Sequence, residues 1–153
     1  MKPKFLFLCL LLSTIGLSAF AQSTAPQAAK KIQLTEAVST LIVEDDITVV
    51  LTDSKADHLS VEGDAKAVLA TIVDGQLVLS ARKSFGASDV TVYVPAGQLS
   101  KVFLNGTGSL SSSEILSNQR IKIFLASEAK INVRSRGSVS VETNNDIQFV
   151  QGK

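Results

Sequence analysis

The chain has 153 residues, and its 15 Lys and Arg residues nearly balance its 14 Asp and Glu residues. A formal net charge of +1 excludes a strong overall attraction to nucleic acid or to an anionic membrane. The one cysteine, Cys9, lies in the apolar N-terminal stretch, so the rest of the chain has no disulfide and no cysteine-based metal site. An apolar core alone must therefore hold the domain together.

Residues 1–21 are predicted to be a signal peptide. Lys2 and Lys4 form a positive start, an uncharged apolar stretch follows, and residues 19–21 (Ala-Phe-Ala) match a small-x-small cleavage site. The apolar stretch is shorter than a typical membrane span of roughly 20 residues. We therefore expect an exported protein, periplasmic or at the cell surface, with no transmembrane segment after cleavage.

Residues 22–37 begin polar and alanine-rich, which predicts a flexible lead-in. A single β domain is expected over residues 38–150. Its first half contains short β-branched or alternating runs, which are typical of strands. These runs lie at residues 39–43, 47–51, 58–62, 72–79 and 90–94.

Two local signals interrupt these strands. Asp74 and Gly75 separate two apolar runs, which predicts a tight hairpin. Residues 64–70 form the one plausible helical turn, with Asp64 as its N-cap. Any helix there is short and would depend on packing.

The region from Val102 to Val150 carries a repeat. Apolar residues stand two apart, and polar breaks begin at residues 117, 126, 135 and 144. Antiparallel meander strands would fit this pattern, and so would rungs of about 18 residues in which Ile121 and Ile123 stack in parallel on Val139 and Val141. Because the breaks lack the Asn-Gly or Asp-Gly chemistry of tight hairpins, we favour the second topology. The sequence predicts an all-β, single-stranded β-helix or solenoid-like domain, with a β-sandwich as the alternative.

The order of these motifs resembles the head GIN domain family of auto-transporter adhesins. The matching series is EDDITVVL (44–51), LSVEGD (59–64), VDGQLVL (73–79), VTVYVP (90–95), residues 99–102 and NGTG (105–108). The chain departs from the family at residues 46–48, where Asp-Ile-Thr replaces Gly-Ile-Asn, and at residues 126–128, where Ala-Ser-Glu replaces a Gly-x-Gly turn. The resemblance implies an exported, non-enzymatic, β-helix-like domain over roughly residues 38–150.

The residues that could carry chemistry have simpler structural explanations. His58 is the only histidine, and the chain has no Gly-x-Ser-x-Gly elbow, so a serine-hydrolase triad is not indicated. The carboxylates Asp45, Asp46, Asp53 and Asp57 lack calcium-loop spacing and are interpreted as turn residues. Gly106 and Gly108 are expected to permit positive φ at a corner. No cofactor, metal site or catalytic residue is predicted.

Basic residues accompany the repeat. If its aliphatic residues point inward, their charged neighbours must point outward, because burying an unpaired charge costs several kcal/mol. Stacked rungs would then align a basic stripe that could contact an anionic envelope glycan, although exposed Lys and Arg are also ordinary solubility charge. The stripe consists of Arg120, Lys122, Lys130, Arg134 and Arg136. Only Phe103 and Phe124 are nearby outward rings, too few for single-stranded nucleic acid.

The last predicted strand has little chain beyond it. It consists of Ile147, Gln148, Phe149 and Val150. An uncovered edge strand invites pairing, so we expect self-association, docking of another envelope protein, or cover by a neighbouring loop. The sequence thus predicts a non-enzymatic, exported envelope module, adhesin-like or scaffold. The alternative is a periplasmic or surface binder of anionic glycan, and an enzyme acting on polysaccharide comes third.

Overall fold

The computed structural model describes residues 29–82 and 90–143, and over these ranges the chain forms strands and no helix. The strands are β1 (Lys30–Gln33), β2 (Thr40–Val43), β3 (Thr48–Thr52), β4 (His58–Glu62), β5 (Val68–Val73), β6 (Gln76–Ala81), β7 (Thr91–Pro95), β8 (Lys101–Leu104), β9 (Ser109–Ser112), β10 (Arg120–Leu125), β11 (Lys130–Asn132) and β12 (Ser138–Thr143). The described part of the chain accordingly contains no helix able to cross a membrane.

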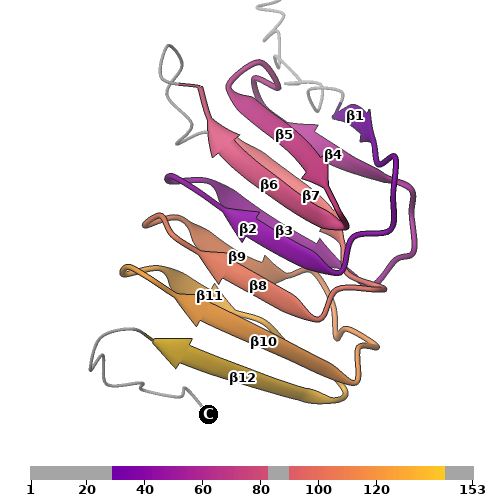
Figure 1. Cartoon of the computed structure of the whole chain (residues 1–153), viewed down its shortest axis with the longest axis vertical. Coiled ribbons are helices and arrows are strands. Elements are labelled where there is room, and N and C mark those ends of the chain that lie inside the picture. Colours follow the sequence, from indigo (N-terminus) through magenta and orange to yellow (C-terminus); the bar gives the residue numbers. More distant parts are fainter. Residues whose placement is uncertain (1–28, 83–89, 144–153) are drawn as a thin grey trace, which may run out of the picture.

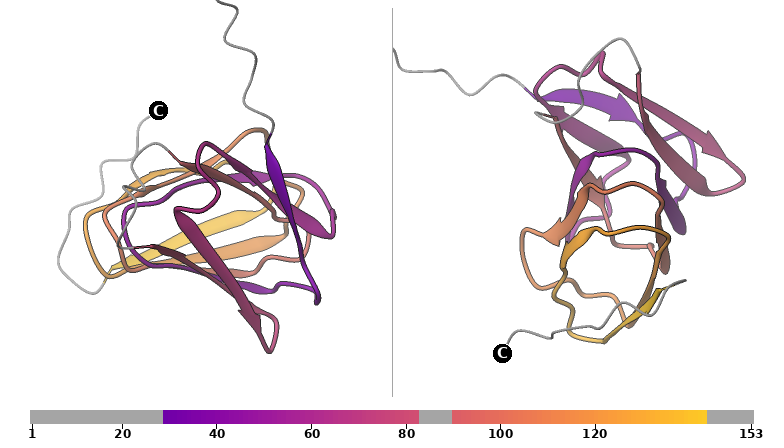
Figure 2. Two further views of the ribbon diagram at one scale, coloured as in Figure 1. Left: turned by 90° about the horizontal axis from the view of Figure 1, so that it is seen from above. Right: turned by 90° about the vertical axis from the view of Figure 1, so that its left-hand side faces the viewer.

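The strands make two six-stranded sheets that face each other (Figure 1). Sheet A has the order β1-β4-β7-β3-β9-β11, and sheet B has the order β12-β10-β8-β2-β6-β5. From β8 onward the chain alternates between the sheets. We call each pair of successive strands, one from each sheet, a coil: β2 with β3, β8 with β9, and β10 with β11 are the inner coils, and β12 is the described strand of the last coil. Seen from above, the two sheets are opposite walls of a flattened interior (Figure 2).

Neighbouring coils stack in parallel register. Ile121 pairs with Val139 and Ile123 pairs with Val141, which confirms the pairing predicted from the repeat. The same arrangement continues across sheet B, where β10 pairs with β8 and β8 pairs with β2. In sheet A, β11 pairs in parallel with β9, and β9 with β3.

The sheets are mixed rather than wholly parallel. Strand β5 returns antiparallel on β6, and β4 runs antiparallel to both β7 and β1. This arrangement is consistent with the β-sandwich alternative, and a β-helix over the whole domain, the leading expectation, is not shown. The physical reason lies in the N-terminal half, where a tight turn joins β5 to β6 and where β4 lies between β1 and β7 in the opposite direction.

The clearest of these reversals is the predicted hairpin, which is confirmed. Strands β5 and β6 close with the pair Val73 and Gln76. Between them Asp74 has φ 50° and Gly75 has φ 71°. Positive φ at both central residues is the requirement of a type I′ turn, which glycine meets without strain.

Only the start of the predicted helical turn at residues 64–70 forms: the backbone N–H of Ala67 donates to the carbonyl of Asp64 at 2.9 Å, whereas residues 68–70 belong to strand β5. The Asp64 carboxylate accepts a hydrogen bond from the backbone N–H of Lys66 at 2.9 Å. The chain then enters β5 at Val68, which is buried and pairs with Ala81. Strand pairing and burial therefore prevail over the local helical preference.

The expected flexible lead-in, residues 22–37, contains strand β1. Its Ile32 pairs with Leu59 of β4, and both Ile32 and Leu34 pack against the core. Burial of these two aliphatic side chains offsets the loss of chain entropy, so this part of the lead-in is ordered.

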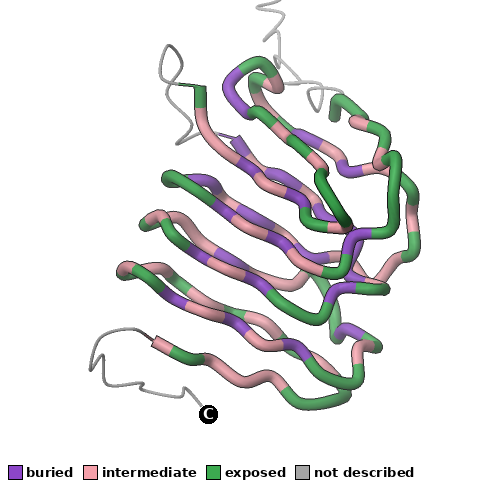
Figure 3. Tube along the Cα trace, in the orientation of Figure 1, coloured by how far each residue is buried: buried purple, intermediate pink, exposed green. Residues whose placement is uncertain are grey.

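The core lies between the sheets, and within the described ranges every buried side chain is apolar, that of Pro95 included. Fully burying a Leu, Ile or Val contributes about 1.5–3 kcal/mol. The largest side chains of this core are Leu41, Ile47, Leu51, Leu59, Leu77, Leu79, Leu99, Leu110, Leu116, Ile121 and Ile123. Figure 3 shows buried positions recurring on β2, β3, β8, β9 and β10, whereas β11 and β12 have none.

Candidate functional site

Acidic residues at the corners hold one coil to the next. Asp46 accepts hydrogen bonds from the backbone N–H of Thr107, at 3.1 Å, and from its hydroxyl. Asp53 accepts from the backbone N–H of Ser117 at 2.9 Å and from its hydroxyl at 2.6 Å. The side-chain hydrogen bond, followed by the backbone one, lowers the pKa of each carboxyl. The interpretation of these two aspartates as turn residues is confirmed.

The glycines of the NGTG motif are needed for a different reason from the predicted one. Neither has positive φ, because Gly63 and Gly75 are the only described glycines that do. A Cβ atom added to Gly106 would lie 1.8 Å from the carbonyl oxygen of Asp45, and one added to Gly108 would lie 2.2 Å from that of Ile47. The backbones of stacked corners approach so closely that only glycine fits.

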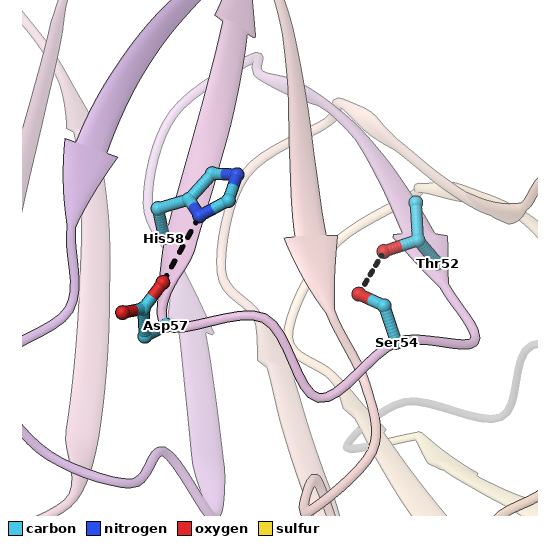
Figure 4. A network of polar contacts seen from close by, with 4 residues as sticks. All are labelled: Thr52, Ser54, Asp57 and His58. Carbon is cyan, nitrogen blue, oxygen red and sulfur yellow. Dashed lines mark hydrogen bonds and ion pairs between the residues drawn. The ribbon is translucent and has the colours of Figure 1, made fainter.

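His58 stands at the start of β4, as expected for a surface strand-end residue. Its Nδ1 lies 3.1 Å from Oδ1 of Asp57, its neighbour in sequence, and this contact is the largest cause of the lowered pKa of Asp57. Nearby, the hydroxyls of Thr52 and Ser54 lie 3.1 Å apart. Figure 4 shows two separate pairs, not a serine–histidine–aspartate chain.

The predicted basic stripe is divided between the sheets. Arg120 and Lys122 lie on β10 of sheet B, whereas Lys130 lies on β11 of sheet A. Arg134 and Arg136 flank the short bridge between Leu116 and Ser135. All five side chains are exposed or half-buried, as predicted, but they do not form one line on one face. Binding of a glycan by these five residues stays a prediction.

The outer face of sheet B, which points away from the core, carries a row of apolar side chains. In-register pairing aligns Ile42 of β2, Phe103 of β8 and Phe124 of β10. The two rings are stacked, with centroids 4.7 Å apart and planes at 11°. All three side chains are half-buried, so the row is partly accessible.

A parallel row of polar residues runs beside it. Register aligns Gln76, Thr40, Lys101 and Lys122 on strands β6, β2, β8 and β10. The two lysines are direct cross-strand neighbours. Lys122 has a distant ion pair with Glu142 of β12, at 4.0 Å, whereas Lys101 has no ion pair with a described residue. Sheet B therefore presents aromatic rings and positive charge side by side.

Two hollows flank the ring pair. The first, about 340 Å³, is lined by Thr40, Ile42, Gln76, Lys101, Phe103 and Asn105. The second, about 350 Å³, lies at Phe124 and includes Glu142. A third, about 240 Å³, lies elsewhere, at the loops that carry Val38, Ser54 and Asp57.

Sequence reasoning noted Phe103 and Phe124 only as rings too few for nucleic acid, and it left Lys101 out of the stripe. A signal was present, because the tetrapeptide Lys-Val-Phe-Leu at residues 101–104 recurs as Lys-Ile-Phe-Leu at 122–125. The recurrence places like residues on stacked strands. The predicted edge strand, Ile147, Gln148, Phe149 and Val150, and the predicted signal peptide both lie outside the described residues.

Comparisons with known proteins agree on the fold. The family described as "Putative auto-transporter adhesin, head GIN domain" matches residues 38–153, as the motif series led us to expect. No curated protein is similar enough in sequence to match.

Three solved structures are similar in fold. A "putative adhesin" from Bacteroides fragilis has 16% identity and a TM-score of 0.54, over 74% of this chain and 60% of that one. A "putative adhesin" from Parabacteroides merdae has 18% identity and a TM-score of 0.54, over 76% and 55%. A "putative lipid binding protein" from Parabacteroides distasonis has 14% identity and a TM-score of 0.53, over 75% and 58%. The chain thus spans less than two thirds of their length.

Proposed function

We propose, because the chain belongs to the head GIN domain family of auto-transporter adhesins, that it is a non-enzymatic envelope module with an adhesin-like role. The supporting observation is that each of its two six-stranded sheets presents a broad outer face, which is suited to surface contact. The aspartates Asp46 and Asp53 are engaged in holding coils together, a structural task. Export to the periplasm or the cell surface is part of this proposal.

The finer architecture that we propose is a short solenoid joined to an antiparallel end. Parallel registers run through β2, β8, β10 and β12 in sheet B and through β3, β9 and β11 in sheet A. Each coil adds one strand to each sheet, so the outer faces extend with the number of coils. Stacked repeats of this kind are suited to extended binding surfaces.

The experiment that tests this function measures contact and chemistry together. Beads coated with the purified protein are incubated with cells and with isolated envelope polysaccharide, and both bead retention and release of reducing ends are followed. We expect retention on cells and no released product. Release of product would contradict a non-enzymatic module, and absence of retention would contradict an adhesin-like one.

A second candidate function is binding of anionic glycan, and one observation favours it. Lys101 and Lys122 are cross-strand neighbours beside two half-buried, stacked rings on sheet B. The surface proposed for this function is therefore the outer face of sheet B, in place of the predicted stripe, whose residues are divided between the two sheets. Retention that weakens as salt is added would support it.

A further inference from the structure

The ring pair on sheet B is partly accessible. In-register side chains on neighbouring strands lie about 4.8 Å apart, and the centroids of Phe103 and Phe124 are 4.7 Å apart with nearly parallel planes. Phe124 therefore packs on one side of the Phe103 ring, and Ile42, the in-register partner of Phe103 on β2, lies on the other side. Phe103 is half-buried, so part of its ring is accessible, and Phe103 borders the hollow of about 340 Å³.

The remaining lining of this hollow is polar and basic. Gln76 and Asn105 supply amide groups that donate and accept hydrogen bonds, and Thr40 supplies a hydroxyl. Lys101 supplies a positive charge that no described carboxylate neutralises. A sugar ring has apolar C–H faces and a polar rim, so it matches an aromatic face surrounded by such groups. An acyl chain would leave the polar lining without hydrogen-bond partners, which is unfavourable.

The second hollow shares Phe103 and Asn105 with the first but differs in charge. It contains Phe124 and the carboxylate of Glu142, and it lacks Lys101. Glu142 lies 4.0 Å from Lys122, so the charge of that lysine is partly balanced. An acidic ligand is therefore favoured in the hollow that contains Lys101 and disfavoured in the hollow that contains Glu142.

We propose that the hollow lined by Ile42 and Phe103 is a subsite for one sugar residue of an acidic polysaccharide. The C–H face of the sugar packs on the accessible part of the Phe103 ring, its carboxylate pairs with Lys101, and its hydroxyls bond to Gln76 and Asn105. This inference rests on the glycan-binding candidate described above and assigns it a site and a ligand class.

The test uses polygalacturonate as the acidic probe and dextran as the neutral control, with binding measured by affinity electrophoresis. The unaltered protein is expected to bind polygalacturonate and not dextran. Phe103→Leu should weaken binding about three- to tenfold, because the aromatic face is lost. Lys101→Gln should weaken binding about two- to fivefold and reduce its salt dependence. Phe103→Tyr keeps the ring and should retain binding, which separates loss of the site from loss of folding.

Matched controls lie on sheet A. Tyr93→Leu removes a ring from the outer face of sheet A, and Lys130→Gln removes a charge from β11. Neither substitution should change polygalacturonate binding by more than about twofold. Failure of the unaltered protein to bind polygalacturonate, or equal losses in the sheet A controls, would overturn the proposal. Binding of phosphatidylglycerol vesicles that depends on Phe103, without polygalacturonate binding, would assign the hollow to lipid instead. Retention of beads on cells is measured separately, so an adhesin-like role can persist when this subsite fails.

Discussion

The inner coils and the last coil of this domain follow the same sequence pattern but differ in burial. Ile121 on β10 is completely buried, whereas Val139, its in-register partner on β12, is only half-buried. Both point toward the interior, and both are β-branched. The difference arises because β10 lies between two described strands, β8 and β12, whereas β12 has a described neighbour, β10, on one side only. Burial in this fold thus depends on neighbouring coils as much as on the alternation within a strand.

The largest expected effect compares these two partners directly. Ile121→Ala should lower the free energy of unfolding by about 2–5 kcal/mol, because it opens a cavity in a closed core. Val139→Ala should lower it by about 1 kcal/mol or less, because fewer buried contacts are lost. Urea denaturation followed by circular dichroism measures both values. Equal losses would mean that the last coil is covered as well as the inner ones.

The alternation was sufficient to predict which side chains point inward. Ile121, Ile123 and their partners on β12 were assigned to one interior column from spacing alone, and the register agrees. The tight hairpin at Asp74 and Gly75 was also predictable, because its turn type requires particular residues. These features depend on local geometry, which a single sequence contains.

The arrangement of the outer faces was not predictable in the same way. Alternation states that Lys122 and Lys130 point outward, but it does not state which sheet each joins. Register between distant strands also lacks a local signal, because Leu41 pairs with Val102 across the long segment that holds β3 to β7. The hollow at Phe103 combines residues from β2, β6 and β8, so it emerged only from the fold.

A smaller effect is expected at the corners, where glycine permits close stacking. Gly106 lies between two neighbouring corners. A Cβ atom added to it would clash with the carbonyl oxygen of Asp45 on one side, and its own carbonyl accepts a hydrogen bond from the Ser127 hydroxyl, at 2.8 Å, on the other. Gly106→Ala should cost about 2–3 kcal/mol of stability through overpacking. Gly137 lies in the corner before β12, where an added Cβ atom would clash with the carbonyl oxygen of Gln119. Gly137→Ala should lower stability by about 1 kcal/mol, because β12 can shift away.

The glycine comparison is measured by thermal unfolding of the two single variants. A larger loss for Gly137→Ala than for Gly106→Ala would contradict the difference in freedom between the inner and last coils. Gly63, which has φ 98°, provides a separate control for backbone conformation. Gly63→Ala should destabilise through strain in the left-handed region and not through stacking.

The smallest effect concerns pH, and it again separates the inner coils from the last. Asp46 and Asp53 join inner corners through carboxylates whose pKa values are lowered by hydrogen bonds, from Thr107 and Ser117 respectively. The corners next to the last coil use the hydroxyls of Ser127 and Ser135, which do not titrate in this range. Acid should therefore weaken the inner corners first.

The sign follows from proton linkage. A carboxyl whose pKa is lower in the folded state binds fewer protons there than in the unfolded chain. Its contribution to stability is therefore complete above the unfolded pKa of about 3.9 and is lost as pH falls through the folded pKa. The urea concentration at the unfolding midpoint should thus be lower at pH 3 than at pH 7. Asp46→Asn with Asp53→Asn should show a smaller fall, because an amide does not titrate in this range. At residue 46 the amide oxygen can accept both hydrogen bonds from Thr107. At residue 53 it can accept the one from the backbone N–H of Ser117, while the amide N–H donates to the Ser117 hydroxyl. Ser127→Ala removes a corner hydrogen bond that has no titrating group, so it should lower stability equally at both pH values. A fall in the double variant as large as in the unaltered protein would show that these carboxylates do not carry the pH dependence.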